Sequence, residues 1–396
     1  MKILVADKVS AKLVIDLQAL GCDITLNPEL TPETLPAALP GFEALIVRST
    51  RVTAAAIEAG AALSLIIRAG AGVNTIDLAT ASEKAIYVAN CPGKNTDAVA
   101  ELALGLLIAA DRRLPDATAD LRAGKWRKKE YGKARGLKGR TLGIVGLGSI
   151  GTAMAQRAQG LGMNVIAWSR SLTPEKAKTL DIGYCATLDE LAEKADVVSV
   201  HLALSSATRG LLSAEFFARL RKNAIFINTS RSEVVDTAAL KAAVRNNGLR
   251  AALDVFENEP ADGEAEFADR ELAGLAVAAT PHIGASTDQA EEAIAAETVR
   301  IVKVFMETGK PVNAVNPRKS HTGIPCVIRH YNRVGVLAGV LHELRSEGIN
   351  IEEMDNTIFE GEQAACCTLV LDRRPSDAVV QGISRREHII QVMLKC

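Results

Sequence analysis

The chain has 396 residues, 48% of them hydrophobic and 23% charged, and its formal net charge at pH 7 is −1. This length exceeds one ordinary core, so we expect two or three domains, and the near-neutral charge gives no sign of a nucleic-acid or membrane partner. The longest apolar stretch, Leu102–Ala110, is too short to cross a bilayer, and the first residues lack a signal-peptide pattern. Seven scattered cysteines without a Cys-x-x-Cys pair favour reduced thiols in the cytoplasm and no metal site.

The first part of the chain alternates short apolar runs with helix-like stretches, which predicts a parallel sheet. The predicted strands are Ile3–Ala6, Ala44–Val47, Leu65–Arg68 and Ile86–Ala89. A long helix is then predicted over Thr96–Ala110, because Ala100, Leu104 and Leu107 recur at helical spacing.

A second strand–helix series predicts a doubly wound parallel sheet. Its predicted strands are Leu142–Val145, Val165–Trp168, Val197–His201, Ala224–Asn228, Ala251–Val255 and Val277–Ala279. A helix over Asp288–Met306 is apolar on one side, so we expect it to return and pack on the first domain.

The last part of the chain has a different rhythm, with the order strand, helix, strand, strand, helix, strand that is typical of a ferredoxin-like fold. The predicted domains are residues 1–92 with 287–312, a dinucleotide-binding domain of residues 93–286, a linker of residues 313–323, and a small α+β domain of residues 324–396.

A glycine-rich turn is the most informative motif. Gly146, Gly148 and Gly151 form Gly-x-Gly-x-x-Gly between a predicted strand and a predicted helix. The first glycine permits a tight turn, the second lets the backbone approach a pyrophosphate, and the third lets helix and strand pack closely. Together with Ser149 and Ile150, which begin the helix and offer free N–H groups, this motif predicts a Rossmann-type dinucleotide site rather than a structural turn alone.

The end of the next strand bears on the choice between NAD and NADP. An acidic residue there would bind the ribose 2′-hydroxyl, but this chain has Ser169 and Arg170. Arg170 can hold a 2′-phosphate, or it can stack on adenine or face solvent. We expect NAD and leave NADP open.

Charged residues follow successive strands of the second series. They are Arg231, Asp254, Glu259 and His282, and His201 also stands at a strand end. Ligands of open α/β sheets bind beyond the carboxyl ends of the strands, so these side chains should converge on one crevice. A histidine with a carboxylate partner suits acid–base catalysis, and an arginine suits a substrate carboxylate.

The strings GLGSIG, NTSR, DVFENEP and TPHIGAST, in this order and spacing, resemble the D-2-hydroxyacid dehydrogenases over roughly residues 1–315. The resemblance implies that Arg231 binds the substrate carboxylate, that His282 is the acid–base residue and that Glu259 supports it. It implies further that Asp254 holds the nicotinamide carboxamide, while we place His201 on the cofactor side of the site or in a structural role.

One position departs from the family pattern. Members usually have glycine after the catalytic arginine, and this chain has Ser232. If that position needs a positive φ, serine is strained there and the arginine loop differs.

The first domain offers candidates for substrate recognition. Arg48 and Arg68 end predicted strands, and two guanidinium groups beside a glycine-rich turn suit a phosphate. They resemble the phosphoglycerate dehydrogenase branch, which implies oxidation of 3-phosphoglycerate to 3-phosphohydroxypyruvate, the first step of serine biosynthesis. On the same resemblance, Lys128 lies nearest the phosphate, and the backbone N–H groups of Ala71, Gly72 and Asn74 bind the substrate carboxylate.

Residues 324–396 resemble an ACT domain, a small amino-acid-sensing module. The resemblance implies serine as an allosteric effector, bound by His330, Asn332 and Asn350, with the effector between paired domains of two subunits. The family pattern has proline where Val334 stands. The alternative is a domain used only for oligomerisation, and the family suggests a homodimer or a homotetramer.

Two other functions remain open. An NADPH-linked glyoxylate or hydroxypyruvate reductase is favoured by Arg170 and disfavoured by Arg68 and the C-terminal domain. An NADH-sensing regulatory protein on the same fold would bind the cofactor without robust turnover, and an ACT domain would be unexpected in such a protein.

Overall fold

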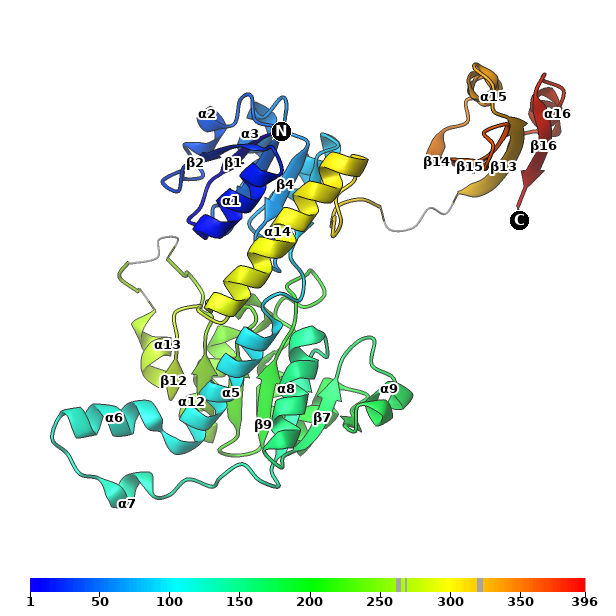
Figure 1. Ribbon diagram of the computed structural model, residues 1–396. Coiled ribbons are helices and arrows are strands. Elements are labelled where there is room, and N and C mark those ends of the chain that lie inside the picture. Colours follow the sequence, from blue (N-terminus) through cyan, green and yellow to red (C-terminus); the bar gives the residue numbers. More distant parts are fainter. Residues whose placement is uncertain (261–264, 268, 319–322, 396) are drawn as a thin grey trace. The chain divides into compact units, whose positions relative to one another are not determined.

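The computed structural model describes residues 1–260, 265–267, 269–318 and 323–395 (Figure 1). Contacts divide the chain into two compact units, Met1–Asn316 and Pro317–Cys396. The boundary between them lies within the stretch predicted as a linker, of which residues 319–322 fall outside the described residues. Among the residues that the structure describes, no helix is both long and apolar enough to span a membrane.

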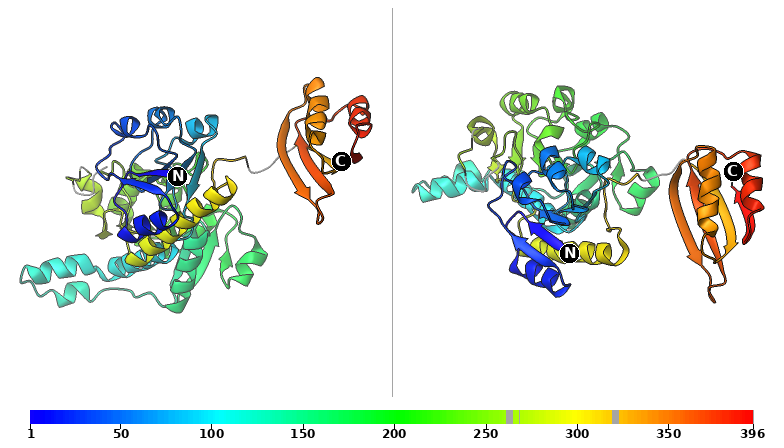
Figure 2. Two further views of the ribbon diagram at one scale, coloured as in Figure 1. Left: turned by 45° about the horizontal axis from the view of Figure 1, so that its top comes forward. Right: turned by 90° about the horizontal axis from the view of Figure 1, so that it is seen from above.

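The first sheet of the larger unit has five parallel strands in the order β2-β1-β3-β4-β5. Its strands are β1 (Lys2–Val5), β2 (Asp23–Leu26), β3 (Ala44–Val47), β4 (Leu65–Arg68) and β5 (Tyr87–Asn90). The helices that follow these strands are α1 (Ala11–Ala19), α2 (Leu35–Ala38), α3 (Ala54–Ala59) and α4 (Leu78–Glu83). Helices α1 and α14 (Asp288–Thr308) cover one face and α2 to α4 the other, which leaves two apolar cores (Figure 2).

The second sheet has seven parallel strands in the order β12-β11-β10-β9-β6-β7-β8. They are β6 (Thr141–Val145), β7 (Asn164–Trp168), β8 (Gly183–Tyr184), β9 (Val197–Val200), β10 (Ile225–Asn228), β11 (Arg250–Leu253) and β12 (Ala278–Ala279). Its helical elements are α5 (Thr96–Arg112), α8 (Ser149–Gly160), α9 (Pro174–Thr179), α10 (Leu188–Lys194), α11 (Ala214–Arg219), η1 (Ser232–Val234), α12 (Thr237–Asn247) and α13 (Arg270–Leu275). The chain winds outward from β6 to β8 and then restarts at β9 on the other side, so the topological switch point lies between β6 and β9.

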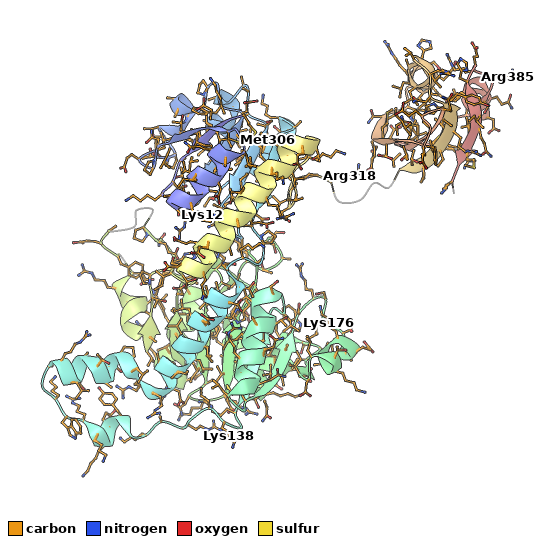
Figure 3. The ribbon with its side chains drawn as sticks, in the orientation of Figure 1. Lys12, Lys138, Lys176, Met306, Arg318 and Arg385 are labelled. Carbon is orange, nitrogen blue, oxygen red and sulfur yellow. The ribbon has the colours of Figure 1, made fainter. Side chains whose placement is uncertain are left out.

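Two long helices link the sheets of the larger unit. Helix α5 leads from the first sheet to the second, and α14 leads back and packs beside α1 (Figure 1). Figure 3 labels Lys12 on α1 and Met306 near the end of α14. The core between them contains Leu13, Leu17 and Ile301, and the predicted return of this helix is therefore confirmed.

The smaller unit has one antiparallel sheet in the order β14-β15-β13-β16. Its elements are β13 (Ile324–Tyr331), α15 (Val336–Ser346), β14 (Ile351–Ile358), β15 (Ala364–Leu371), α16 (Asp377–Ser384) and β16 (Ile389–Leu394). Residues of both helices form one core with the sheet. The βαββαβ order and this strand arrangement agree with the predicted ferredoxin-like fold.

Sequence analysis missed β2 and β8 and a helical arm that comprises α6 (Leu114–Arg122) and α7 (Lys128–Tyr131). Strand β2 has no fully buried side chain and β8 is only two exposed residues, so neither shows the apolar run of an interior strand. The arm projects from the larger unit in both views of Figure 2. Helix α6 likewise buries no side chain, so it lacks a core-facing stripe.

Candidate active site

The glycine turn lies at the switch point, directly after the central strand β6. A side chain on Gly151 would place its Cβ 2.1 Å from the carbonyl oxygen of Gly146. A side chain on Gly146, whose φ is +95°, would come within 2.5 Å of the carbonyl oxygen of His201. The space where a Cβ of Gly148 would lie is open. Two glycines are thus required by the protein's own packing, while the third leaves room for a ligand beside the first turn of α8, where Ser149 and Ile150 lie.

His201 borders this turn at the carboxyl end of β9. Its Nε2 lies 2.9 Å from Ser199 Oγ, and its buried Nδ1 has no hydrogen-bond partner among the described residues. Burial lowers the pKa of His201 to about 4. The imidazole is therefore neutral near pH 7, which fits a structural or cofactor-side position better than an acid–base role.

The end of β7 lies beside the turn as well, because Gly146 N donates to the carbonyl of Trp168. The next residues are the partly exposed Ser169 and the exposed Arg170. The structure therefore keeps a cation, and no acid, at the position expected to face the adenosine ribose.

His282 and Glu259 form a pair beyond β11 and β12. His282 Nδ1 lies 2.5 Å from Glu259 Oε2, and Glu259 Oε1 accepts from the backbone N–H of Phe256. Partial burial alone would raise the pKa of Glu259, but the hydrogen bond and the charge of His282 outweigh burial, so the net pKa is lowered. An ionised Glu259 can only accept, so Nδ1 carries the hydrogen and Nε2 has a lone pair for a substrate proton.

Asp254 anchors the loop that carries His282. Its buried carboxylate accepts from Thr280 Oγ1 at 2.6 Å and from the backbone N–H groups of Ile283 and Gly284 at 2.9 Å. Burial raises the pKa of Asp254, and these three hydrogen bonds act in the opposite direction. His282 has a φ of +52°, so the loop is held in a conformation that few non-glycine residues adopt. Positioning the histidine loop is therefore the role visible in the structure, and the contact of Asp254 with nicotinamide remains a proposal.

Arg231 follows β10 on a turn that hydrogen bonds of the Asn228 side chain stabilise. The side-chain amide of Asn228 donates to the carbonyl of Arg231, and its oxygen accepts from Ser230. Ser232 begins the short helix η1 and is not among the residues with positive φ. The strain considered for serine at this position is therefore absent.

Arg231 reaches across to the glycine-rich turn of the first sheet. A Cβ on Gly72 would lie 2.5 Å from Arg231 Nη2, so only glycine lets the guanidinium approach so closely. The turn itself is fixed by Asn90, whose side-chain amide donates to the carbonyl of Ala71 at 2.5 Å, while Asn74 is exposed next to Gly72. The structure thus brings Ala71, Gly72 and Asn74 together with Arg231.

Arg68 ends β4 behind the same turn and is largely buried. Its Nε is buried without a hydrogen-bond partner among the described residues. Its Nη1 occupies the place where a Cβ of Gly70 would be, at 1.6 Å from that position. Burial, followed by repulsion from Arg231 and Arg48, lowers the pKa of Arg68 to about 10. The side chain still carries its charge near pH 7, so this corner of the site holds a partly buried cation that suits an anion.

Arg48 follows β3, the strand next to β4. The carboxylate of Asp7 accepts from the backbone N–H groups of Arg48, Ser49 and Thr50 and so fixes this turn. Arg48 Nη1 forms a 2.8 Å ion pair with Glu291 Oε1 in the first turn of α14. Arg48, Arg68 and Arg231 therefore form one cationic cluster, and Glu291 is an acidic neighbour that sequence analysis did not find.

Within one chain, the structure does not bring Lys128 to the arginine cluster, so its place nearest a bound phosphate stays a prediction. Lys128 begins α7, on the arm that leaves the end of α5. That end lies at the amino ends of the second sheet, where Asp111 pairs with Arg140 just before β6. Figure 3 labels Lys138, between the arm and β6, at the opposite end of the unit from Met306. Within one chain, α7 and the carboxyl-end site lie on opposite edges of the sheet, so Lys128 does not join the arginine cluster.

The three predicted effector residues do not form one site within a single chain. His330 pairs with Ala365 and is buried, bonded to Asn356, and Asn332 bonds to Gln363. Asn350 instead pairs with Asp372, beyond the other end of β15. Strands rise about 3.3 Å per residue, so the two groups lie roughly 20 Å apart along the sheet.

Sequence analysis also missed residues that support the site from nearby positions. Thr280 and Gly284 stand in the string TPHIGAST, and Gly70 stands in the glycine-rich turn after Arg68. Only the fold shows that Gly70 accommodates Arg68 and that the other two bind Asp254. Among the described residues, no group of three His, Cys, Asp or Glu side chains is arranged to hold a metal ion.

Comparison with known proteins places this architecture in one family. Residues 104–284 match the model of the D-isomer specific 2-hydroxyacid dehydrogenase NAD-binding domain. The chain is 40% identical over 307 residues to a hydroxypyruvate reductase of Thermotoga maritima, which covers 76% of this chain and 96% of the relative.

Two further matches each cover 80% of this chain. A D-3-phosphoglycerate dehydrogenase of Methanocaldococcus jannaschii is 37% identical over 319 residues, which cover 80% of this chain but only 59% of that relative. The structure of an NAD+-bound 3-phosphoglycerate dehydrogenase of Entamoeba histolytica superimposes with a TM-score of 0.67 at 27% identity, covering 80% of this chain and 98% of the other. On the strength of these matches, the chain belongs to the D-isomer specific 2-hydroxyacid dehydrogenase family and carries its NAD-binding domain.

Proposed function

We propose that this chain oxidises 3-phosphoglycerate to 3-phosphohydroxypyruvate, with NAD as the hydride acceptor. The observation that carries the proposal is Arg68, a largely buried cation without a protein partner among the described residues, which lies close enough to Arg48 and Arg231 to be repelled by both. A substrate with a phosphate at one end and a carboxylate at the other supplies anions for such a cluster. Relatives named D-3-phosphoglycerate dehydrogenase support the same choice.

The cofactor fits the glycine turn, because the open space at Gly148 faces the free N–H groups of the first turn of α8. Gly146 and Gly151 hold that turn, His201 borders it after β9, and Asp254 lies further along the same edge of the sheet, after β11. Bound NAD supplies the acceptor for the hydride that leaves C2 of the substrate.

The chain's own residues handle the substrate and the proton. Arg231 binds the carboxylate together with the backbone of the Ala71–Asn74 turn, and this orients C2. His282 Nε2 accepts the hydroxyl proton as the C2–H bond breaks, which leaves a ketone. The imidazolium formed is stabilised by Glu259, whose 2.5 Å contact is already in place. In the reverse direction the same proton returns from His282 to the C2 oxygen.

A second candidate is an NADPH-linked hydroxypyruvate reductase. It is favoured by the exposed Arg170 where an acid would select NAD, and by the relative of that name in Thermotoga maritima. A substrate without phosphate would leave the charge of Arg68 without a counterion, which is why we prefer the phosphorylated acid.

For the smaller unit we propose an ACT domain that binds serine across a pair of subunits. The support is its ferredoxin-like topology together with the separation of His330 and Asn332 from Asn350 along the sheet. Two such units related by a twofold axis bring the two ends together, whereas one unit does not. A dimer or tetramer is part of this proposal.

The test is a coupled assay of 3-phosphoglycerate oxidation with NAD and with NADP, each with and without serine. We expect turnover with NAD that falls when serine is added. The His282→Asn variant serves as a control for contaminating activity, because asparagine tolerates the positive φ at this position and should lower kcat by roughly 10²- to 10⁴-fold.

The other outcomes are equally informative. Activity confined to glyoxylate or hydroxypyruvate with NADPH would replace the proposal by the reductase. Binding of NADH without turnover of any 2-hydroxy acid would point to a cofactor-sensing protein. Turnover that ignores serine would remove the regulatory part alone.

A further inference from the structure

We propose that Glu291 is a specificity-determining residue of the substrate site. In the free protein its carboxylate neutralises Arg48, and a substrate anion must take its place. Glu291 therefore weakens the binding of a phosphorylated side chain and reduces the preference of the site for phosphorylated over unphosphorylated acids. This inference rests on the proposed function, because it takes the cluster of Arg48, Arg68 and Arg231 as the place where substrate anions bind.

The backbone of Arg48 is held firmly, whereas its side chain has few contacts and can change its partner. Its backbone is fixed by the carboxylate of Asp7, which accepts from three successive N–H groups. Its guanidinium has a single hydrogen-bonded partner among the described residues, Glu291 Oε1 at 2.8 Å. The remaining donors of the planar guanidinium are left for a ligand.

The two arginines at the ends of β3 and β4 differ in this respect. The buried Nε of Arg68 has no hydrogen-bond partner among the described residues, whereas Arg48 is balanced by Glu291. Glu291 thus brings a negative charge to the edge of a site built from cations. That charge attracts Arg48 but repels any incoming phosphate.

The ion pair between Arg48 and Glu291 is exposed enough for a substrate anion to replace Glu291 as the partner of Arg48. The side chains of Arg48 and Glu291 are 35% and 41% exposed, and such pairs are weak because water competes for both charges. A small cavity beside the pair, lined also by Lys8, Ser10 and Ile294, has a volume of about 30 Å³, enough for one water molecule. Glu291 can therefore give up Arg48 without leaving a buried charge behind.

Helix α14 offers a matched control for this residue. Glu292 lies in the same turn, carries the same charge and is exposed without a partner among the described residues. The helix start is held independently by Thr287, whose hydroxyl accepts from Ala290 N, and by Asp288 in the first turn. Both Glu291→Gln and Glu292→Gln are therefore expected to fold.

The experiment measures KM and kcat of the full chain for 3-phosphoglycerate and for D-glycerate, which lacks the phosphate. Glu291→Gln is expected to lower KM for 3-phosphoglycerate by roughly threefold to tenfold, because the repulsion between one carboxylate and a nearby phosphate is removed. It should leave kcat and the constants for D-glycerate within about twofold, and Glu292→Gln should change neither substrate's constants by more than that.

A binding measurement separates this inference from the proposed function. Titration of the protein with inorganic phosphate should give a dissociation constant that is lower by the same factor in Glu291→Gln than in Glu292→Gln, whether or not 3-phosphoglycerate is turned over. If the wild-type chain does not oxidise 3-phosphoglycerate but this difference appears, the proposed function fails and the role of Glu291 stands. The inference is wrong if Glu291→Gln leaves KM and phosphate affinity unchanged, or if it raises KM and weakens phosphate binding. It is also wrong if both variants change these constants equally, because Glu291 then has no particular effect on anions.

Discussion

At the scale of single residues, the candidate site combines well-supported groups with one unsupported charge. Glu259 holds His282 through one hydrogen bond, and Asp254 holds the histidine loop through three. The buried Nε of Arg68 has no such hydrogen bond within the part of the chain that the structure describes. A buried cation without a partner lowers the stability of the free protein, and it persists where a bound anion uses it.

This argument predicts opposite effects of Arg68→Met on stability and on substrate binding. Methionine fills a similar volume without a charge, so the free energy of unfolding in urea should rise by roughly 1 kcal/mol. KM for 3-phosphoglycerate should rise about a hundredfold, since a charge-assisted contact is worth up to about 3 kcal/mol.

The control for that variant is Arg51→Met, which removes an exposed arginine of the neighbouring loop. It should alter neither quantity beyond the error of measurement. A loss of stability in Arg68→Met would mean that Arg68 is a structural residue with partners in the protein, and the anion site would then need another explanation.

At the scale of elements, the turn between β6 and α8 assigns different tasks to its glycines. Gly151 is required by packing, because its place against the carbonyl of Gly146 leaves no room for a methyl group. Gly148 is not required by packing, since the space beside it is open and its φ of −83° suits alanine. Folding and cofactor binding are thus separable in one turn.

We therefore expect Gly151→Ala and Gly148→Ala to behave differently. Gly151→Ala should lower the free energy of unfolding by roughly 1–3 kcal/mol, because the added methyl group meets backbone that must shift. Gly148→Ala should stay within about 1 kcal/mol of the wild type but weaken NADH binding about tenfold or more, because the methyl group occupies the approach of the pyrophosphate. Denaturant unfolding and NADH fluorescence titration measure the two effects, and equal stability losses in both variants would refute this division.

At the scale of the whole larger unit, a buried carboxylate ties together the connections between the two sheets. Glu297 in α14 contacts Lys94 ahead of α5, Arg300 in its own helix, and Asn313 in the segment that returns to β5. The hydrogen bond from Arg300 is the largest cause that lowers the pKa of Glu297, and despite opposing burial the pKa falls to about 2. Glu297 thus connects segments that are distant in the sequence.

The sign of its pH dependence follows from this lowered pKa. The folded protein binds a proton on Glu297 less readily than the unfolded chain, so the stabilisation is complete above the unfolded pKa of 4.5 and is lost as the pH falls toward 2. Glu297→Gln should cost up to about 3 kcal/mol at pH 7, and less than half of that difference should remain at pH 3. Urea unfolding at both pH values measures this, with the exposed Glu307→Gln as control. A difference independent of pH would show that Glu297 acts through shape and not through charge.

The sequence by itself determined the features that depend on neighbouring residues. The strand–helix series, the βαββαβ order and the glycine turn all arise from periodicity or from steric needs within a few residues, so they are legible without the fold. The convergence of Arg231, Glu259 and His282 was also predictable, because parallel strands place their carboxyl ends at one edge of the sheet.

Only the tertiary structure decided which distant segments meet. Arg48 pairs with Glu291 across 243 positions, α7 leaves from the edge opposite to the site, and Asn350 lies at the far end of the sheet from His330. None of these leaves a local pattern, because a charged or polar side chain on a turn looks alike whether it meets water, a partner or a ligand. Strands β2 and β8 were missed for a related reason. Edge strands bury little surface, so they lack the apolar run by which a buried strand is recognised in a sequence.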